Sequence, residues 1–203
     1  MRLKDLSVPV LAAAICGCAA VRPAVPPLPR AMVTPSSIKA EAIVEAGRSV
    51  TLRGKAVIAA KSPASFRIEV LGPFNSTLAL IVSDGESLRV VTGNDPPQFG
   101  ETEPPYPFSA GDIVSFLLGT APAPQDGQMV SEDPSGHVTR IVRLKDGSPV
   151  FTASLSDYRE AGGAHIPFNI SIEGGGRTLR IRYTSVEINP ELDTDFFNSK
   201  ALH

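Results

Sequence analysis

The sequence predicts a mainly β protein with a few short helices. Three observations support this. Short apolar runs, each bounded by Gly, Pro, Asp or Ser, follow one another from residue 50 to residue 188. In the last of these runs apolar and polar residues alternate, which is typical of an antiparallel sheet with one dry and one wet face. The 203 residues are 42% hydrophobic and 20% charged, which suffices for one domain with a sizeable core.

The first 17 residues are predicted to be a signal peptide. Residues 1–4 carry Arg2 and Lys4, and the apolar run 6–15 is too short to span a bilayer as a stable helix. The run ends in "ICGC", which resembles a bacterial lipobox with Gly17 in the small position before the cleaved bond. We therefore expect Cys18 to be lipidated; the alternative is that Cys16 and Cys18 are merely apolar residues of the signal peptide. The rest of the chain has no cysteine and hence no disulfide.

Residues 18–35 are predicted to be a tether between the lipidated cysteine and a domain over 36–203. The segment is rich in proline and poor in large apolar side chains, so it should be semi-extended. Two or three acyl chains, at about 0.8 kcal/mol per buried CH₂, would anchor the protein firmly. In lipoprotein sorting an Asp after the cysteine favours the inner membrane. Ala19 stands there instead, so we expect the periplasmic face of the outer membrane.

The domain begins with "SSIKAEAIVEAG" (36–47), whose Ser cap, helix formers and final Gly favour a short helix, with a strand as the competing interpretation. Four strand-like runs follow: "VTLRGKAVIAAK", "SFRIEVLG", "STLALIVSD" and "SLRVVTG". Ser-Pro, Gly-Pro and Asp-Gly-Glu-Ser turns separate them. Further along, we expect one hairpin about Asp146-Gly147 and a second about Gly174–Gly176. In the second hairpin, the apolar side chains up to Tyr183 should point inward and the arginines outward.

One short helix is predicted over "SAGDIVSFLLG" (109–119), after a proline-rich loop over 94–108. Ser109 is the expected N-cap, Asp112 completes a capping box, and Gly119 ends the helix. The helix is apolar nearly all round, so it should lie on the dry face of the sheet.

The turn "GPFNS" (72–76) carries a phenylalanine at its tip. Leaving Phe74 in water forgoes roughly 1.5–3 kcal/mol of burial free energy. Because the lipobox tethers the domain to a bilayer, we expect the loop Pro73, Phe74 and Asn75 to insert into the membrane. The alternative is a tip that folds back onto its own sheet.

We expect no enzyme activity, cofactor or metal. The spacing of His137, His165 and His203 suits no metal site, and the sequence has no nucleophile elbow or phosphate loop. A pI near 5.9 without a Lys/Arg run argues against nucleic acid as a partner.

Together, these features resemble the LolB-type outer-membrane lipoprotein receptors of the LolA/LolB-like superfamily. "GPFNST" (72–77) is similar to the LolB pattern "NPLGST", whose apolar residue protrudes from a loop. "YPFSAGDIVSFLLGTAP" (106–122) is similar to the helix "IPLxxLxxWILGxP" of that family, with Phe116 in place of Trp. "FNISIEGGGRTLRIRY" (168–183) is similar to its closing hairpin.

The resemblance implies an unclosed antiparallel β-barrel with a helical lid, whose apolar cavity binds lipoprotein acyl chains or phospholipid. A periplasmic LolA-type carrier would be the donor. The runner-up function is a lipid-anchored scaffold or sensor that binds a protein partner. Ordinary core packing is the other interpretation of each cavity candidate. The candidates are Phe66, Ile68, Val70, Leu78, Leu80, Ile113, Phe116, Leu117, Phe168 and Ile170.

Overall fold

The computed structural model describes residues 33–47, 51–92 and 108–198. The expected signal peptide, Cys18, nearly all of the tether and the proline-rich loop up to residue 107 lie outside these residues. No helix in the described ranges is long and apolar enough to cross a membrane.

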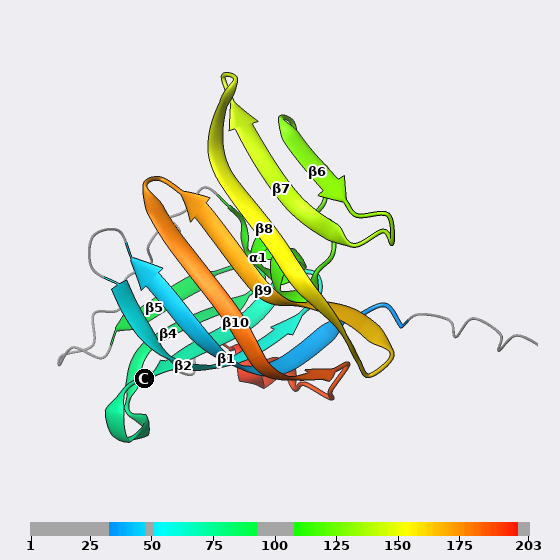
Figure 1. Cartoon of the computed structure of the whole chain (residues 1–203). Helices are drawn as coiled ribbons and strands as arrows, with labels where there is room; N and C mark the ends of the chain where they lie inside the picture. The colour runs from blue at the N-terminus through cyan, green and yellow to red at the C-terminus, as the bar shows by residue number, and fades with distance from the viewer. Residues whose placement is uncertain (1–32, 48–50, 93–107, 199–203) are drawn as a thin grey trace, which may run out of the picture. The chain divides into compact units, whose positions relative to one another are not determined.

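Ten antiparallel strands form one sheet, in the order β5-β4-β3-β2-β1-β10-β9-β8-β7-β6 (Figure 1). Within the described ranges, β5 and β6 are the two edges and do not pair with each other, so the sheet is an unclosed barrel. The strands are β1 (Ser37–Gly47), β2 (Thr51–Lys61), β3 (Ser65–Leu71), β4 (Thr77–Asp84), β5 (Leu88–Thr92), β6 (Gln128–Glu132), β7 (Val138–Lys145), β8 (Ser148–Ala161), β9 (Ala164–Gly174) and β10 (Arg177–Ile188).

The first element is a strand, so the helix favoured for 36–47 is wrong. In β1, Ile38 and Ala40 are buried while Lys39 and Glu41 are exposed, which is the two-residue period of a strand. The segment joins β2 on one side and β10 on the other. Tertiary pairing has here outweighed the helix propensity of Ala and Glu.

Both predicted C-terminal hairpins are confirmed. Asp146 and Gly147 link β7 to β8 with φ values of 53° and 76°. Gly175 and Gly176 link β9 to β10 with φ values of 58° and 71°. Two consecutive left-handed residues are what a two-residue hairpin turn needs, because their twist matches that of the strands.

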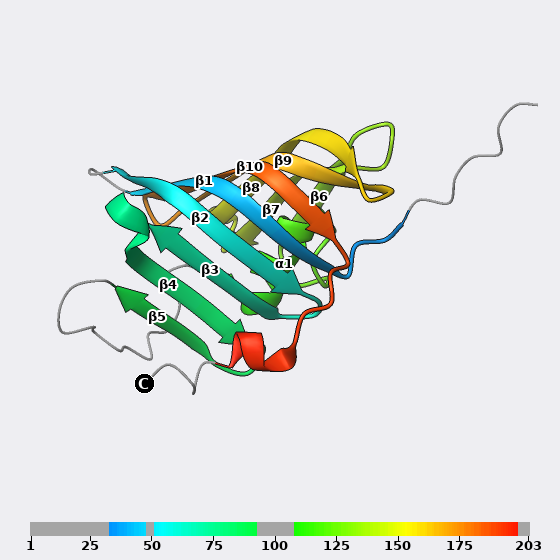
Figure 2. The ribbon, with the colours of Figure 1, turned by 90° about the horizontal axis from the view of Figure 1, so that it is seen from below.

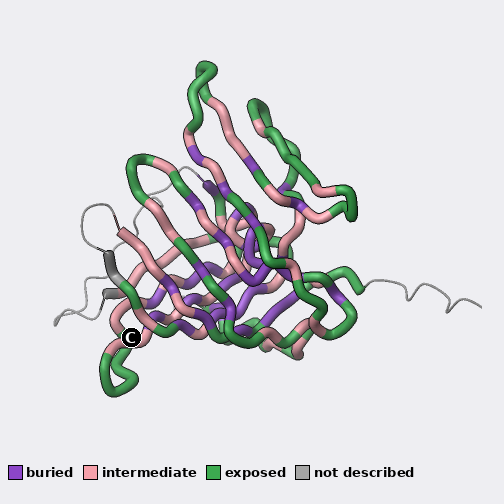
Figure 3. The backbone as a smooth tube through the Cα atoms, in the orientation of Figure 1, coloured by how far each residue is buried: buried purple, intermediate pink, exposed green. Residues whose placement is uncertain are grey.

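The predicted helix is confirmed as α1 (Ala110–Leu118), with the expected cap at each end. Ser109 and Asp112 form the capping box, and Gly119 ends the helix in the left-handed conformation. The helix contacts β2, β3 and β9, which belong to opposite halves of the sheet. We call the face that it covers the inner face. Buried residues gather there, around α1 (Figure 3).

The sheet forks between β9 and β10. β9 pairs with β8 along its length, whereas β10 pairs with β9 only from Arg177 to Arg182. Beyond Arg182, β10 continues beside β1 as far as Ile188 (Figure 1). The two halves of the sheet therefore separate beyond the pair Arg182–Asn169.

The outer face carries a second, smaller apolar cluster over β2–β4. Ala59, Leu80 and Val82 are buried although they point away from the face that α1 covers. The C-terminal turn η2 (Thr194–Phe197) packs on β3 and β4 and buries Phe197 (Figure 2).

Candidate functional site

An apolar cavity of about 120 Å³ lies between α1 and the inner face. Every side chain that borders it is aliphatic or aromatic, so the cavity offers a ligand dispersion contacts and no hydrogen bond. The lining residues are Phe66, Ile68, Ile81, Leu88, Val90, Phe108, Ile113, Phe116, Leu117, Ile170, Ile172, Leu179 and Ile181.

The structure brings part of the predicted cavity set together. Phe66, Ile68, Ile113, Phe116, Leu117 and Ile170 border the cavity. Val70 and Phe168 are buried in the same core but away from the cavity. Leu78 and Leu80 do not line it, and Leu80 faces outward, opposite Glu69.

The face of β4 predicted to point inward, with Leu78 and Leu80, is the wrong one. Ile81 pairs with Ile68 and borders the cavity, so the inward positions are odd-numbered. Because Leu80, Ile81 and Val82 are all apolar, the alternation in this strand is too weak to fix the face. A β-bulge at Val70/Leu71 shifts the pairing as well.

In this arrangement the cavity accommodates only a small apolar group. Ligand pockets commonly measure about 300–1,000 Å³, and an apolar cavity of about 150 Å³ takes benzene. Binding a long acyl chain therefore requires α1 to move away from the sheet.

Two polar contacts hold α1 on the sheet. The Tyr183 hydroxyl donates to the carbonyl of Leu117 at 3.1 Å, and burial raises the pKa of Tyr183, so the phenol remains a donor. Near the other end, Nη2 of Arg143 in β7 donates to Oδ1 of Asp112 at 3.2 Å. Asp112 also accepts from the backbone N–H of Ser109 at 2.8 Å.

Phe74 occupies the tip of the turn η1 (Pro73–Asn75), and its side chain is fully exposed at 103%. Phe74 and Asn75 are left-handed, with φ values of 60° and 58°. The Gly72 N–H donates to the Ser76 carbonyl at 2.7 Å, and Ser76 Oγ donates to the Pro73 carbonyl at 2.9 Å. The tip thus does not fold back onto its sheet. A left-handed bulky residue costs roughly 1–2 kcal/mol, and such strain often marks a functional position.

The structure also joins two histidines that lie 28 residues apart. Nε2 of His137 is 2.9 Å from Nδ1 of His165, and Nδ1 of His137 is 3.0 Å from Oδ2 of Asp133. The His137 ring stacks on Tyr158 at 4.4 Å between centroids. Hydrogen bonds from His137 lower the pKa of Asp133. The contact crosses β8 and depends on the exact registers of β7–β8 and β8–β9, which the sequence alone does not show.

The same part of the chain, 33–47, 51–92 and 108–198, contains no group of three or more His, Cys, Asp or Glu side chains that could hold a metal ion. The histidine pair connects the residue just before β7 to β9, across β8.

No family model and no curated protein matches this chain. Solved structures do. A putative outer membrane lipoprotein-sorting protein domain from Vibrio parahaemolyticus is similar with a TM-score of 0.55 at 10% identity, covering 80% of this chain and 89% of that one. A LolA superfamily protein from Nitrosomonas europaea has a TM-score of 0.54 at 13% identity, with coverages of 82% and 91%. A DUF1329 family protein from Desulfovibrio piger has a TM-score of 0.54 at 12% identity, with coverages of 84% and 92%.

At these identities the likeness shows the fold alone. The fold class predicted from the sequence, an unclosed LolA/LolB-like antiparallel sheet with a helix on one face, is confirmed.

Proposed function

We propose that this chain is an outer-membrane-anchored acceptor, which binds acyl chains of lipoproteins, or another lipid, beneath α1 and delivers them to the membrane. The observation that carries the proposal is Phe74, fully exposed on a hydrogen-bonded, left-handed turn of the domain that holds the apolar cavity. Phe74 gains no burial free energy in water, whereas a membrane-delivering protein can bury it by inserting it into lipid.

Transfer in this proposal needs no covalent step. A periplasmic LolA-type carrier would present the acyl chain, and each CH₂ that enters the cavity would contribute about 0.8 kcal/mol. Opening α1 breaks the contacts Tyr183–Leu117 and Arg143–Asp112, so acyl burial must offset their loss.

The anchor and tether complete the proposal. Lipidated Cys18 would hold the domain at the periplasmic face of the outer membrane. If extended as polyproline, a tether of 18 residues (18–35) would reach about 55 Å, and the proposal needs that reach for the tip of η1 to touch the same bilayer.

Filling the cavity tests acyl binding. Ile113 borders the cavity from α1, and Ile113→Trp should fill the space and abolish binding of a fluorescent fatty acid. Because the chain has no native tryptophan, emission from the new indole also reports whether the site stays apolar. Met129→Trp, on the exposed edge strand β6, is the matched control. Unchanged fatty-acid affinity in a folded Ile113→Trp variant would exclude the cavity as the binding site.

Cargo can be identified directly. Native mass measurement of protein extracted from outer membranes in mild detergent should show co-purifying lipoprotein or phospholipid. Protein that is always lipid-free would argue against an acceptor.

The small cavity favours a second candidate, a lipid-anchored scaffold or sensor that uses this fold to bind a protein partner. Depletion separates the two functions. Loss of an acceptor should make other lipoproteins accumulate at the inner membrane, and loss of a scaffold should not.

A further inference from the structure

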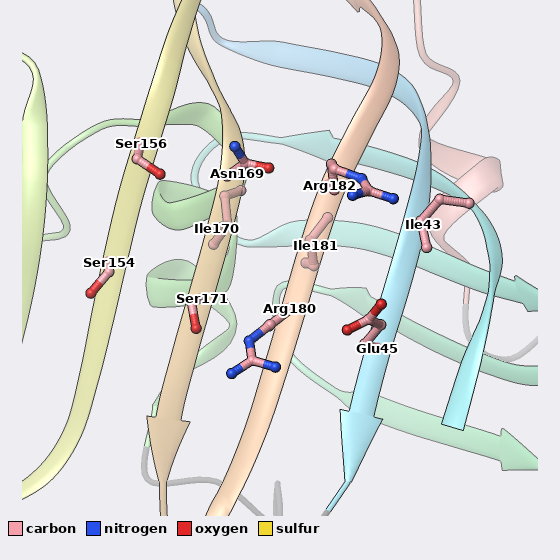
Figure 4. A pocket seen from close by; sticks show the side chains of 10 residues that line it. All are labelled: Ile43, Glu45, Ser154, Ser156, Asn169, Ile170, Ser171, Arg180, Ile181 and Arg182. Carbon is pink, nitrogen blue, oxygen red and sulfur yellow. The ribbon is translucent and has the colours of Figure 1, made fainter. Parts of the chain in front are cut away.

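The outer face is hollowed where the sheet forks, into a pocket of about 330 Å³ (Figure 4). This outer-face pocket lies on the opposite side of the sheet from α1, and strands β1, β8, β9 and β10 supply its walls. Its residues are Ile43, Glu45, Ser154, Ser156, Asn169, Ile170, Ser171, Arg180, Ile181 and Arg182.

Strand register places the polar residues of the outer-face pocket in two adjacent rows. Ser154, Ser171 and Arg180 are direct cross-strand neighbours in β8, β9 and β10. In the next row Ser156 pairs with Asn169, which pairs with Arg182. Hydroxyl, amide and guanidinium groups from three strands therefore share one face.

Both guanidinium groups are available to bind a ligand. Neither Arg180 nor Arg182 makes a hydrogen bond or ion pair within the described ranges. Glu45 lies opposite Arg180 in register, but its carboxylate pairs with Nε of Arg53 at 3.3 Å. The pocket thus presents two guanidinium groups and one carboxylate, that of Glu45, and its net charge is positive.

This donor set suits a phosphate group. The planar fork of arginine matches two oxygens of a phosphate, and serine hydroxyls can donate to the others. Ile43, which faces outward beside Arg182, adds apolar surface that a glycerol backbone can contact. A volume of about 330 Å³ lies at the lower end of the range for ligand sites, which fits a headgroup.

The row that contains Arg182 also leads to the Phe74 turn. Arg182 pairs with Ile43, Ile43 with Lys55, and Lys55 with Leu71, the last residue of β3. At about 4.8 Å per strand, these three steps span roughly 14 Å. Lys55 places another positive charge along this path.

We propose that the outer-face pocket binds the phosphate of an anionic phospholipid headgroup in the bilayer that Phe74 enters. This inference rests on the proposed function, because the pocket reaches the lipid headgroups only if Phe74 inserts into the same bilayer. Phe74 then inserts into the bilayer, and Arg180 and Arg182 make the protein prefer anionic membranes.

Vesicle binding tests the proposal. The intact protein should bind phosphatidylglycerol vesicles at least about tenfold more tightly than phosphatidylcholine vesicles, since each basic residue near an anionic surface contributes measurably. Arg180→Ser with Arg182→Ser should remove most of that difference.

The control removes the same charge elsewhere. Lys39 and Lys145 are exposed and do not line the pocket, so Lys39→Ser with Lys145→Ser should lower affinity no more than about threefold. Equal losses in the two double variants would overturn the site in favour of diffuse charge attraction.

Two further measurements separate this proposal from its alternatives. Fatty-acid binding should be unchanged in the double arginine variant. If the cavity binds no fatty acid, the vesicle measurement still tests the headgroup site by itself. Glycerol 3-phosphate in solution should bind weakly and compete with phosphatidylglycerol vesicles. Tight binding of glycerol 3-phosphate without any vesicle preference would overturn the membrane source and indicate a site for a soluble phosphate.

Discussion

Asp112 and Arg143 form an ion pair that joins the first turn of α1 to β7. Oδ1 of Asp112 lies 3.2 Å from Nη2 of Arg143, and the two side chains are only 1% and 15% exposed. The guanidinium also lies over the Phe151 ring, 5.1 Å from its centroid. Water thus barely reaches this contact between α1 and the sheet.

Arg143→Met should therefore destabilise the domain and loosen α1. Breaking a buried pair strands the Asp112 carboxylate, so we expect a loss of about 3 kcal/mol in the free energy of unfolding, measured by urea denaturation. Arg159→Met removes a shorter but exposed pair with Asp157, at 2.6 Å, and should change little. If both variants behave alike, the Asp112–Arg143 contact does not fasten the helix.

Replacing Phe74 should separate folding from delivery. Phe74→Gly relieves a left-handed side chain, so the free energy of unfolding should stay unchanged or rise by up to about 1 kcal/mol. Phe74→Glu should also fold. Both variants should lose cargo delivery to vesicles. Unfolding of the Glu variant would mean that Phe74 packs in the domain.

Gly119→Ala should be costly at the end of α1. The added Cβ would lie 2.4 Å from Cδ of Pro167, on a backbone with φ of 69°. We expect a loss of more than about 2 kcal/mol in thermal or urea unfolding. Gly136→Ala is the matched control, because Gly136 has φ of 81° with open space around it. Only backbone strain, about 1 kcal/mol, should appear there. Equal losses would show that the contact with Pro167 is unimportant.

Asp133 should make stability depend on acid pH. Hydrogen bonds from His137 hold the folded-state pKa of Asp133 below its ordinary value near 4. Its contribution is therefore fully present above about pH 4 and is lost as the pH falls through the lowered pKa. Asp133→Asn should flatten the pH dependence of the unfolding midpoint between about pH 5 and pH 2. An unchanged slope would contradict this role.

Local features of the fold were predictable from the sequence, because each depends on residues close together in the chain. The turn at Asp146-Gly147 needs left-handed residues, and α1 has Ser109 and Gly119 at its ends. The strand β1, where a helix was predicted, was harder to predict from the sequence, because it depends on pairing with β10, about 140 residues away.

The misplaced and missed residues depend on distant contacts. Leu80 is buried on the outer face, which the C-terminal turn η2 covers. The sequence "TLALIVSD" contains no pattern that would indicate that η2 covers its outer face. Likewise, His137 meets His165 only because β7 and β9 flank β8. The outer-face pocket needs the fork at Arg182, which alternation alone cannot reveal.

The order of the strands has a consequence for how the chain folds. Strands β1 to β5 join neighbours in sequence by short turns, and so do β6 to β10. The two meanders meet along a single ladder, in which Ile38 pairs with Ile188. Each meander can form quickly from local contacts, whereas this ladder closes a loop of about 150 residues. Joining β1 to β10 should therefore be the slow step. Until the last strand is available, the edge of β1 stays open to pairing with another molecule.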